Sequence, residues 1–341
     1  MHNDFKELLI NANNIHSGGG AVLLNKFITS KSLNKFLKIQ LIVDERFDSS
    51  NIRINNVIIQ KVKPTIISRL ISELKIAKFE GSVLAFGNLP PLFSRSKRII
   101  VFLHNVLYFY PKLIAEFPLK VRIRLHFERV ILAIKCRSVS KFLVQTPHMK
   151  RQLIEHRLAA QNKILVAPFA DLAHYQPISK TNKSFICVSS GDPHKNIKNL
   201  ILAWKLLGEE GIFPKLYLTV SSKIYRNLDQ WINEITKENQ LEIINLGNIG
   251  SMEINDYYQS GSALIFPSFC ESLGLPLIEA DYCGVAILAP ELDYVRDITT
   301  PAQTFDPHSP ISIARAVKRH LRLSEDLTRL LEVEEVVNEI L

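Results

Sequence analysis

Two glutamates late in the chain stand where their carboxylates could hold hydroxyl groups beside a phosphate. Glu271 follows an apolar run that ends near Phe266, and Glu279 comes after seven intervening residues, one of which is Gly274. A strand ending near Phe266 would place Glu271 beyond its carboxyl end, where parallel sheets bind ligands. A helix beginning after Gly274 would offer free N–H groups to a phosphate. Beside a phosphate, both carboxylates are suited to gripping hydroxyl groups, although a helix cap and a solvated glutamate are the alternative.

A lysine follows the predicted end of another strand. Lys195 lies in the segment Ser189–Asn196, which follows the apolar run 184–189 and precedes a helical pattern over 197–207. Its ammonium group is a point charge suited to a leaving diphosphate. A surface lysine near a helix start is the alternative interpretation.

The first predicted strand is followed by three glycines, Gly18, Gly19 and Gly20. They allow the backbone to approach a ligand closely and leave a helix start facing it. The pattern is neither Gly-x-Gly-x-x-Gly nor Gly-Lys-Ser/Thr, so the dinucleotide-fold and P-loop interpretations fail. A flexible loop without a ligand is the alternative. His104 stands at the end of the predicted strand 98–104, and this position favours a role in the site over a structural one.

These residues need a scaffold of parallel strands. Apolar runs predict strands at 7–12, 36–43, 57–62, 82–87, 98–104, 141–145, 163–167, 184–189, 215–220, 242–246, 262–266 and 285–288. Helical periodicity separates them at 20–30, 65–78, 119–135, 147–156, 197–207, 226–239, 252–260 and 275–282. This alternation predicts an α/β protein with two doubly wound, Rossmann-like domains facing a cleft. The predicted domains are 1–170 and 171–310, followed by a helical segment, 311–341.

Charge divides the chain unevenly. Residues 1–177 hold 27 Lys and Arg against 11 Asp and Glu, whereas residues 178–341 hold 15 against 22. The densest basic stretch, 120–129, alternates Lys and Arg with apolar residues. A solvated helix face is one interpretation. Docking on anionic lipid head groups, with shallow apolar insertion, is the other. Nucleic acid is not expected as a partner, because no nucleic-acid-binding motif accompanies the charge.

Composition excludes several classes of protein. The 341 residues are 47% hydrophobic and 22% charged, which excludes a disordered or collagenous chain. No apolar run is long enough to cross a membrane as a helix, and no secretory signal is expected at the N-terminus. Four cysteines without a Cys-x-x-Cys pair indicate reduced thiols, and no cluster has metal-ligand spacing. We therefore expect a cytoplasmic protein without a metal or other cofactor.

The pair Glu271 and Glu279, with Ser-Leu-Gly-Leu-Pro between them, resembles the Glu-x7-Glu signature of retaining nucleotide-sugar glycosyltransferases of family 4, which have the GT-B fold. The resemblance implies that the first Glu contacts the transferred sugar and the second the ribose. It further implies contacts of the intervening backbone with the sugar and diphosphate, at Ser272, Leu273, Gly274 and Leu275.

The same resemblance extends to other positions. It implies that Lys195 stabilises the diphosphate, that Gly19 and Gly20 lie beside the donor phosphates, and that His104 lies near the transferred sugar. Ser190 stands where the family often has Arg, so stabilisation of the diphosphate would depend more on Lys195 and on backbone donors. Asp171 resembles the Asp of the family's linker motif and is interpreted as structural. The absence of Asp-x-Asp disfavours the metal-dependent GT-A class.

The resemblance implies a retaining hexosyltransferase that acts by front-face transfer. We expect a nucleotide-sugar donor and a glycan or glycolipid acceptor at the inner membrane face, as in lipopolysaccharide, O-antigen or exopolysaccharide assembly. The catalytic group would be His104, Glu271 and Lys195. Two alternatives remain open at this point: another nucleotide-sugar enzyme on this scaffold, such as an epimerase or phosphorylase, and a non-catalytic assembly subunit.

Overall fold

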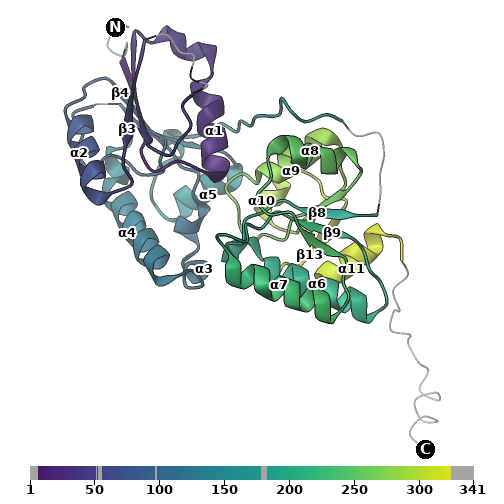
Figure 1. The fold of residues 1–341 in the computed structure, drawn as a ribbon. Helices are drawn as coiled ribbons and strands as arrows, with labels where there is room; N and C mark the ends of the chain where they lie inside the picture. Colours follow the sequence, from purple (N-terminus) through teal and green to yellow (C-terminus); the bar gives the residue numbers. More distant parts are fainter. Residues whose placement is uncertain (1–6, 51, 53–55, 97, 178–182, 324–341) are drawn as a thin grey trace, which may run out of the picture.

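The chain builds two parallel sheets, one from each half of the sequence. A computed structural model describes residues 7–50, 52, 56–96, 98–177 and 183–323. Figure 1 shows the two sheet-centred domains side by side. The linker, residues 167–177, leaves the first domain toward the second in the upper part of the view. The prediction of an α/β protein with two doubly wound, Rossmann-like domains is confirmed.

The first sheet has seven strands in the order β3-β2-β1-β4-β5-β6-β7, and all neighbours run parallel. Its strands are β1 (Glu7–Ala12), β2 (Lys38–Asp44), β3 (Val57–Val62), β4 (Ser82–Ala85), β5 (Ile99–Phe102), β6 (Lys141–Val144) and β7 (Ile164–Val166). Its helices are α1 (Gly18–Ile28), α2 (Ile66–Ala77), α3 (Pro111–Ile114), α4 (Leu119–Lys135) and α5 (Pro147–Glu155). The strand order reverses between β1 and β4, so their carboxyl ends flank a crevice.

The second sheet has six parallel strands in the order β10-β9-β8-β11-β12-β13. They are β8 (Phe185–Cys187), β9 (Leu216–Leu218), β10 (Ile243–Asn245), β11 (Ala263–Ile265), β12 (Ile287–Pro290) and β13 (Gln303–Phe305). The helices are α6 (Ile197–Glu209), α7 (Arg226–Glu238), α8 (Ser251–Gln259), α9 (Leu275–Cys283), α10 (Asp293–Arg296) and α11 (Pro310–His320). Here the order reverses between β8 and β11.

Alternating side chains of the short strands fill cores on both faces of each sheet. Ile186 of β8 packs with α8 and α9, whereas its neighbours Phe185 and Cys187 pack with α6, α7 and α11. The buried Trp204 donates from Nε1 to the carbonyl of Pro214 at 2.8 Å, which satisfies its polar atom inside the core. Helices on both faces explain why these strands are apolar throughout.

The last helical segment begins as predicted and ends early. Helix α11 starts at Pro310 and packs four buried residues into the core of the second domain, but its last residue is His320. Arg322 then adopts a left-handed φ of 59°. The rest of the predicted helical segment, 324–341, lies outside the described residues. Sequence patterning also missed β13, α3 and α10, because runs of three or four residues carry no periodicity.

Candidate active site

Lys195 and Glu271 meet where the strand order of the second sheet reverses. Lys195 follows β8 and Glu271 follows β11, so both leave the carboxyl ends of adjacent strands. Lys195 Nζ lies 2.6 Å from Glu271 Oε1, and the two side chains are 19% and 10% exposed. This ion pair thus joins two residues that are 76 positions apart in the sequence, at a partly buried site.

Asn196 fixes the turn that carries Lys195. It adopts a left-handed φ of 60° and is buried, and its Nδ2 donates to the carbonyls of Pro267 at 3.0 Å and Pro307 at 2.7 Å. The carbonyl of His194 also accepts from the main-chain N–H of Phe269 at 2.8 Å. These bonds tie the turn after β8 to the turn after β11. The sequence analysis did not single out Asn196. Its signal is an asparagine at the change from turn to helix, because asparagine adopts a left-handed backbone more readily than most residues.

Helix α9 begins at Leu275, immediately after Gly274, as predicted. Gly274 has a φ of 71°, and a Cβ there would lie 3.0 Å from Leu277 Cδ1, so the position requires glycine. Pro276 has no N–H, and the N–H of Leu277 is bound to the carbonyl of Gly274 at 2.9 Å. The main-chain N–H groups of Gly274 and Leu275 are therefore the donors that this helix start directs toward a ligand.

Glu279 sits one turn into α9, beside two tyrosines. Burial raises the pKa of Glu279 to about 7, and the neighbouring Tyr175 hydroxyl opposes part of that rise. Burial and the Glu279 carboxyl together raise the pKa of Tyr175 and of Tyr258 far above the usual range. Tyr175 comes from the linker, so the linker helps to close the environment of Glu279. A carboxyl with this pKa changes its charge near neutral pH.

The glycines after β1 face both His104 and the second domain. A Cβ on Gly20 would lie 3.1 Å from His104 Nε2, and a Cβ on Gly19 would lie 3.4 Å from Leu275 Cδ1. Gly18 has a φ of 68° and already belongs to α1, so the three glycines form the first turn of the helix rather than a loop. The start of α1, the end of β5 and the start of α9 therefore adjoin one another.

His104 is held by a residue that the sequence analysis did not identify, Asn88. The main-chain N–H of His104 donates to Asn88 Oδ1 at 2.7 Å, which turns Asn88 Nδ2 toward His104 Nε2 at 3.4 Å. With Nε2 as the acceptor, the ring carries its proton on Nδ1. Burial lowers the pKa of His104 to about 4, so the imidazole is neutral at physiological pH. Asn88 itself has a left-handed φ of 75°. The pair Gly87-Asn88 directly after β4 is the sequence signal for such a turn, because both residue types tolerate this backbone conformation.

The remaining predicted residues lie in the second domain, and two of them contact the first. The hydroxyl of Ser190 donates to Asp192 Oδ2 at 2.8 Å within its own loop. Leu273 is buried, and the carbonyl of Ser272 accepts from Thr146 Oγ1 of the first domain at 3.1 Å. Asp171 forms an ion pair with Lys26 of α1 at 3.0 Å. Thr146 and Lys26 therefore join the first domain to the turn and linker of the second.

The centre of this site combines one ammonium group, which is paired with a carboxylate, with a helix start and the neutral imidazole of His104. In the part of the chain that the structure describes, no three His, Cys, Asp or Glu side chains converge as a metal-binding group. All four cysteines are free and buried. The arrangement can hold a phosphate between an ammonium group and a helix start, and hydroxyls at Glu271 and Glu279.

Part of the chain is similar in sequence to known glycosyltransferases. Residues 172–333 match the family profile described as Glycosyl transferases group 1. The serotype-specific mannosyltransferase WbdA of Escherichia coli is 30% identical over 145 residues, which are 42% of this chain and 18% of that protein. The chain thus spans only a small part of this relative.

Solved structures match over nearly the whole chain. The structure of Anabaena Alr3699/HepE with UDP and glucose superposes with a TM-score of 0.68 at 14% identity, covering 93% of this chain and 90% of that one. WaaG, a glycosyltransferase involved in lipopolysaccharide biosynthesis, gives a TM-score of 0.63 at 12% identity, covering 92% and 91%. At these identities the likeness concerns the fold. The chain therefore has the GT-B fold, and its residues 172–333 are similar to the glycosyl transferases group 1 family.

Proposed function

We propose that the protein is a retaining glycosyltransferase. It moves a sugar from a nucleotide-sugar donor to a membrane-associated glycan or glycolipid, in assembly of a lipopolysaccharide or O-antigen type of glycan. The observation that carries this proposal is the convergence of Lys195, Glu271 and the start of α9 at the crevice of the second sheet. WbdA, named as a mannosyltransferase, and HepE, solved with UDP and glucose, support the class of reaction and of donor.

In this proposal the ribose, the diphosphate and the sugar of the donor are each held by their own set of residues. Glu279 accepts hydrogen bonds from the ribose hydroxyls. The diphosphate lies between Lys195 and the N–H groups of Gly274 and Leu275, which supply the positive charge without a resident metal ion. Glu271 and His104 orient the sugar from opposite domains. The neutral imidazole of His104 suits this role, because Nε2 can accept from a sugar hydroxyl that replaces the long contact to Asn88.

The proposed transfer occurs on one face of the sugar. The acceptor hydroxyl oxygen bonds to the anomeric carbon as the bond from that carbon to the diphosphate oxygen breaks, and the hydroxyl proton passes to the departing phosphate oxygen. Lys195 stabilises the charge that develops on the leaving diphosphate, and it must leave Glu271 to do so. No protein nucleophile is required.

The first domain would present the acceptor at the inner face of a membrane. Helix α4 carries five Lys and Arg against one Glu, and its exposed apolar residues repeat every three or four positions at Leu119, Ile123, Phe127, Val130 and Ile134. This combination of basic and apolar side chains favours an anionic bilayer surface over solvent. Among the described helices, none is both long and apolar enough to cross a membrane.

The test is binding and turnover with a panel of UDP-, GDP-, ADP- and TDP-sugars. A donor that binds only the folded state increases the free energy of unfolding by RT ln(1 + [L]/Kd), and this raises the melting temperature. We expect a rise with one nucleotide class, lost in Glu279→Ala and kept in Glu238→Gln, a variant on the exposed end of α7. Transfer to membrane glycolipid with retained anomeric configuration completes the test. Absence of a shift with every donor would contradict the proposal.

A further inference from the structure

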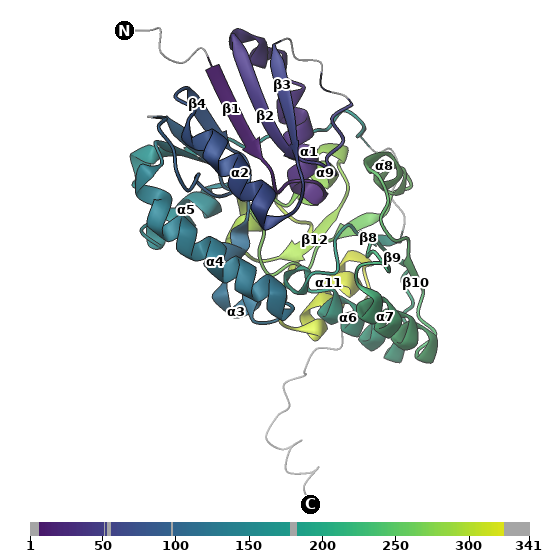
Figure 2. The same ribbon diagram turned by 60° about the vertical axis from the view of Figure 1, so that its left-hand side comes forward.

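The turn that leads into α9 belongs to the second domain, but the first domain holds it. Residues 270–275 connect the end of β11 to the start of α9. Cys270 is fully buried in the apolar cluster of the first domain that also contains residues of α5. At the other end, a Cβ on Gly19 of α1 would lie 3.4 Å from Leu275 Cδ1, and Figure 2 shows α1 beside α9. The first domain therefore contacts both ends of this turn.

Thr146, the residue directly before α5, holds the middle of the turn. Its side chain is fully buried, and its hydroxyl donates to the carbonyl of Ser272 at 3.1 Å. The same oxygen accepts from the main-chain N–H of Met149 at 3.2 Å and so caps α5. A hydroxyl has one hydrogen to donate and two lone pairs, so both bonds form together. Thr146 thus links the start of α5 to the turn of the other domain.

The start of α5 is itself anchored on the second domain. Figure 1 shows α5 beside α10 where the two domains meet. The main-chain N–H of His148 donates to Asp297 Oδ2, so an acidic side chain lies at the positive end of the helix. Arg151 Nη2 lies 3.1 Å from Asp293 Oδ2 and 3.4 Å from Asp297 Oδ2. These contacts fix the helix start, and with it the hydroxyl that caps the helix, against the second domain.

The bond to Ser272 fixes a direction, because the peptide unit is planar. In a trans peptide the carbonyl and the following N–H point to opposite sides, and all peptide bonds of the described residues are trans. The carbonyl of Ser272 faces Thr146, so the N–H of Leu273 points away from Thr146. Among the described residues this N–H has no protein partner, like the N–H groups of Gly274 and Leu275 that follow it. A hydroxyl of the first domain therefore sets the direction of a donor in the second.

Direction matters for a donor that meets a charged ligand. In the proposed function the diphosphate lies between Lys195 and the N–H groups at the start of α9. Hydrogen bonds weaken steeply when the donor points away from the acceptor. An N–H that is already aimed at the developing negative charge needs no reorganisation during the reaction. A cap for α5 requires only the oxygen of Thr146, so the bond from its hydrogen to Ser272 serves the turn and not the helix.

We propose that Thr146 is a positioning residue for the transfer: by holding the carbonyl of Ser272, it aims the N–H of Leu273 at the donor diphosphate. The inference rests on the proposed transferase function. Thr146 acts through the peptide between Ser272 and Leu273 rather than on the donor itself. Because the bond joins the two domains, the aim of this N–H depends on the first domain resting against the turn.

The first experiment compares donor binding and transfer in three variants of the full chain. Thr146→Val keeps the branched shape and loses the hydroxyl, so the affinity for UDP or GDP, whichever binds, should fall about tenfold. Transfer should lose about tenfold or more in kcat with the KM of the acceptor unchanged, because the donor and not the acceptor is misaligned. Thr146→Ser keeps the hydroxyl and should restore both values.

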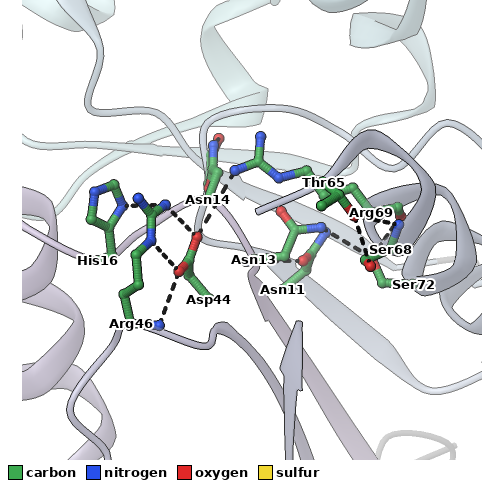
Figure 3. Close-up of polar contacts among 11 residues, drawn as sticks. Asn11, Asn13, Asn14, His16, Asp44, Arg46, Thr65, Ser68, Arg69 and Ser72 are labelled. Carbon is green, nitrogen blue, oxygen red and sulfur yellow. Dashed lines mark hydrogen bonds and ion pairs between the residues drawn. The ribbon is translucent and has the colours of Figure 1, made fainter. Parts of the chain in front are cut away.

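Thr65→Val is the matched control for the loss of a cap. Thr65 caps α2 by accepting from the main-chain N–H of Ser68 at 3.3 Å, and its hydroxyl donates to Ser68 Oγ at 2.9 Å. Figure 3 shows that both of these bonds stay within the start of α2. This variant should lower the melting temperature and leave donor affinity and kcat unchanged.

The second experiment measures the peptide itself and needs no turnover. The sequence contains two Ser-Leu peptide bonds, Ser32–Leu33 and Ser272–Leu273. Serine labelled with ¹³C at the carbonyl and leucine labelled with ¹⁵N therefore leave two signals in an NMR spectrum that correlates each amide with the preceding carbonyl. The Ser272–Leu273 signal should move in Thr146→Val, which removes the donor to its carbonyl, and return in Thr146→Ser. UDP or GDP should shift it in the wild type and shift it less in Thr146→Val, with Ser32–Leu33 as the internal reference.

The outcomes separate this inference from the proposed function. Transfer by the wild type with normal kinetics in Thr146→Val, or with an unmoved Ser272–Leu273 signal, would overturn the positioning role and leave the proposed function standing. Equal kinetic losses in Thr65→Val would assign the effect to helix capping, which also overturns it. A signal that depends on Thr146 but responds to no nucleotide would contradict the proposed function, and the aiming of Leu273 at a diphosphate would fall with it.

Discussion

Lys195 and Glu271, from the turns after two adjacent strands, form an ion pair with 2.6 Å between Nζ and Oε1. Both side chains are mostly buried, so each neutralises a charge that would otherwise be poorly solvated. In the function we propose, an entering diphosphate competes with Glu271 for the same ammonium group. The ion pair would then hold Lys195 in position until the diphosphate binds.

The first prediction concerns the stability of this pair. Lys195→Met should lower the free energy of unfolding by about 1–3 kcal/mol, because Glu271 is left buried without its partner. Adding Glu271→Gln should recover part of that loss, since the stranded charge is removed. Thermal unfolding of the two single variants and the double variant measures the coupling. Additive effects would mean that the pair contributes nothing to folding.

The second prediction concerns catalysis at the start of α1. A Cβ on Gly20 would lie 3.1 Å from His104 Nε2, closer than ordinary contact, so Gly20→Ala must displace the ring or the helix. We expect kcat to fall about tenfold or more, because small misplacements of orienting groups are costly. Gly250→Ala, at the start of α8 in the second domain, is the control, because its Cβ would make an ordinary 3.7 Å contact with Glu253 Oε2. Equal losses in the two variants would contradict the proposed role of His104.

The third prediction concerns pH. Burial raises the pKa of Glu279 to about 7, so the carboxylate form that we propose to bind the ribose increases as pH rises through 7. Nucleotide affinity should therefore increase between pH 6 and pH 8, and titration calorimetry in buffers across this range measures it. Glu279→Gln should make the profile flat.

The same shift has the opposite sign for folding. Because the folded pKa exceeds the unfolded one, the native state binds more protons between about 4.5 and 7, and the contribution of Glu279 to stability falls as pH rises through that window. Donor affinity and stability should thus change in opposite directions. An unchanged affinity from pH 6 to pH 8 would contradict the ribose role.

The fourth prediction concerns the membrane. Replacing Lys120, Arg122 and Arg124 of α4 with Ser should weaken binding to phosphatidylglycerol vesicles by up to about 3 kcal/mol, since each basic residue contributes roughly 1 kcal/mol at an anionic surface. Cosedimentation measures it, with phosphatidylcholine vesicles as the neutral comparison. Lys198, Lys223 and Lys237 of the second domain, all exposed, are the matched triple control. Equal loss in both triple variants would point to net charge alone.

The fifth prediction concerns metal ions. We expect transfer activity to persist after dialysis against EDTA, because Lys195 and the N–H groups of Gly274 and Leu275 supply the positive charge at the diphosphate. Lys195→Met should instead lower kcat by about 10²–10³, the cost of losing one preorganised charge at a developing anion. Activity that disappears with EDTA and returns with Mg²⁺ would contradict this arrangement.

Local sequence was sufficient to predict most of the strands and longer helices. Every strand predicted in the first half overlaps an observed strand, because buried parallel strands are apolar along their whole length. Gly274 before Leu275 predicted the start of α9, and Ser189–Asn196 predicted a turn before α6. These signals lie within a few residues of the feature they specify, so a single sequence carries them.

Only the tertiary structure decided what these residues face. The ion pair of Lys195 with Glu271 depends on β8 lying beside β11, a neighbour relation between strands 78 residues apart. Thr146 reaches Ser272 across a 126-residue separation, and Asn88 holds His104 across a 16-residue separation. Strand order is set by packing of the whole domain, which no local pattern encodes. Residue types and spacing therefore predicted which groups are suited to the proposed chemistry, and the sheet order decided which of those groups meet.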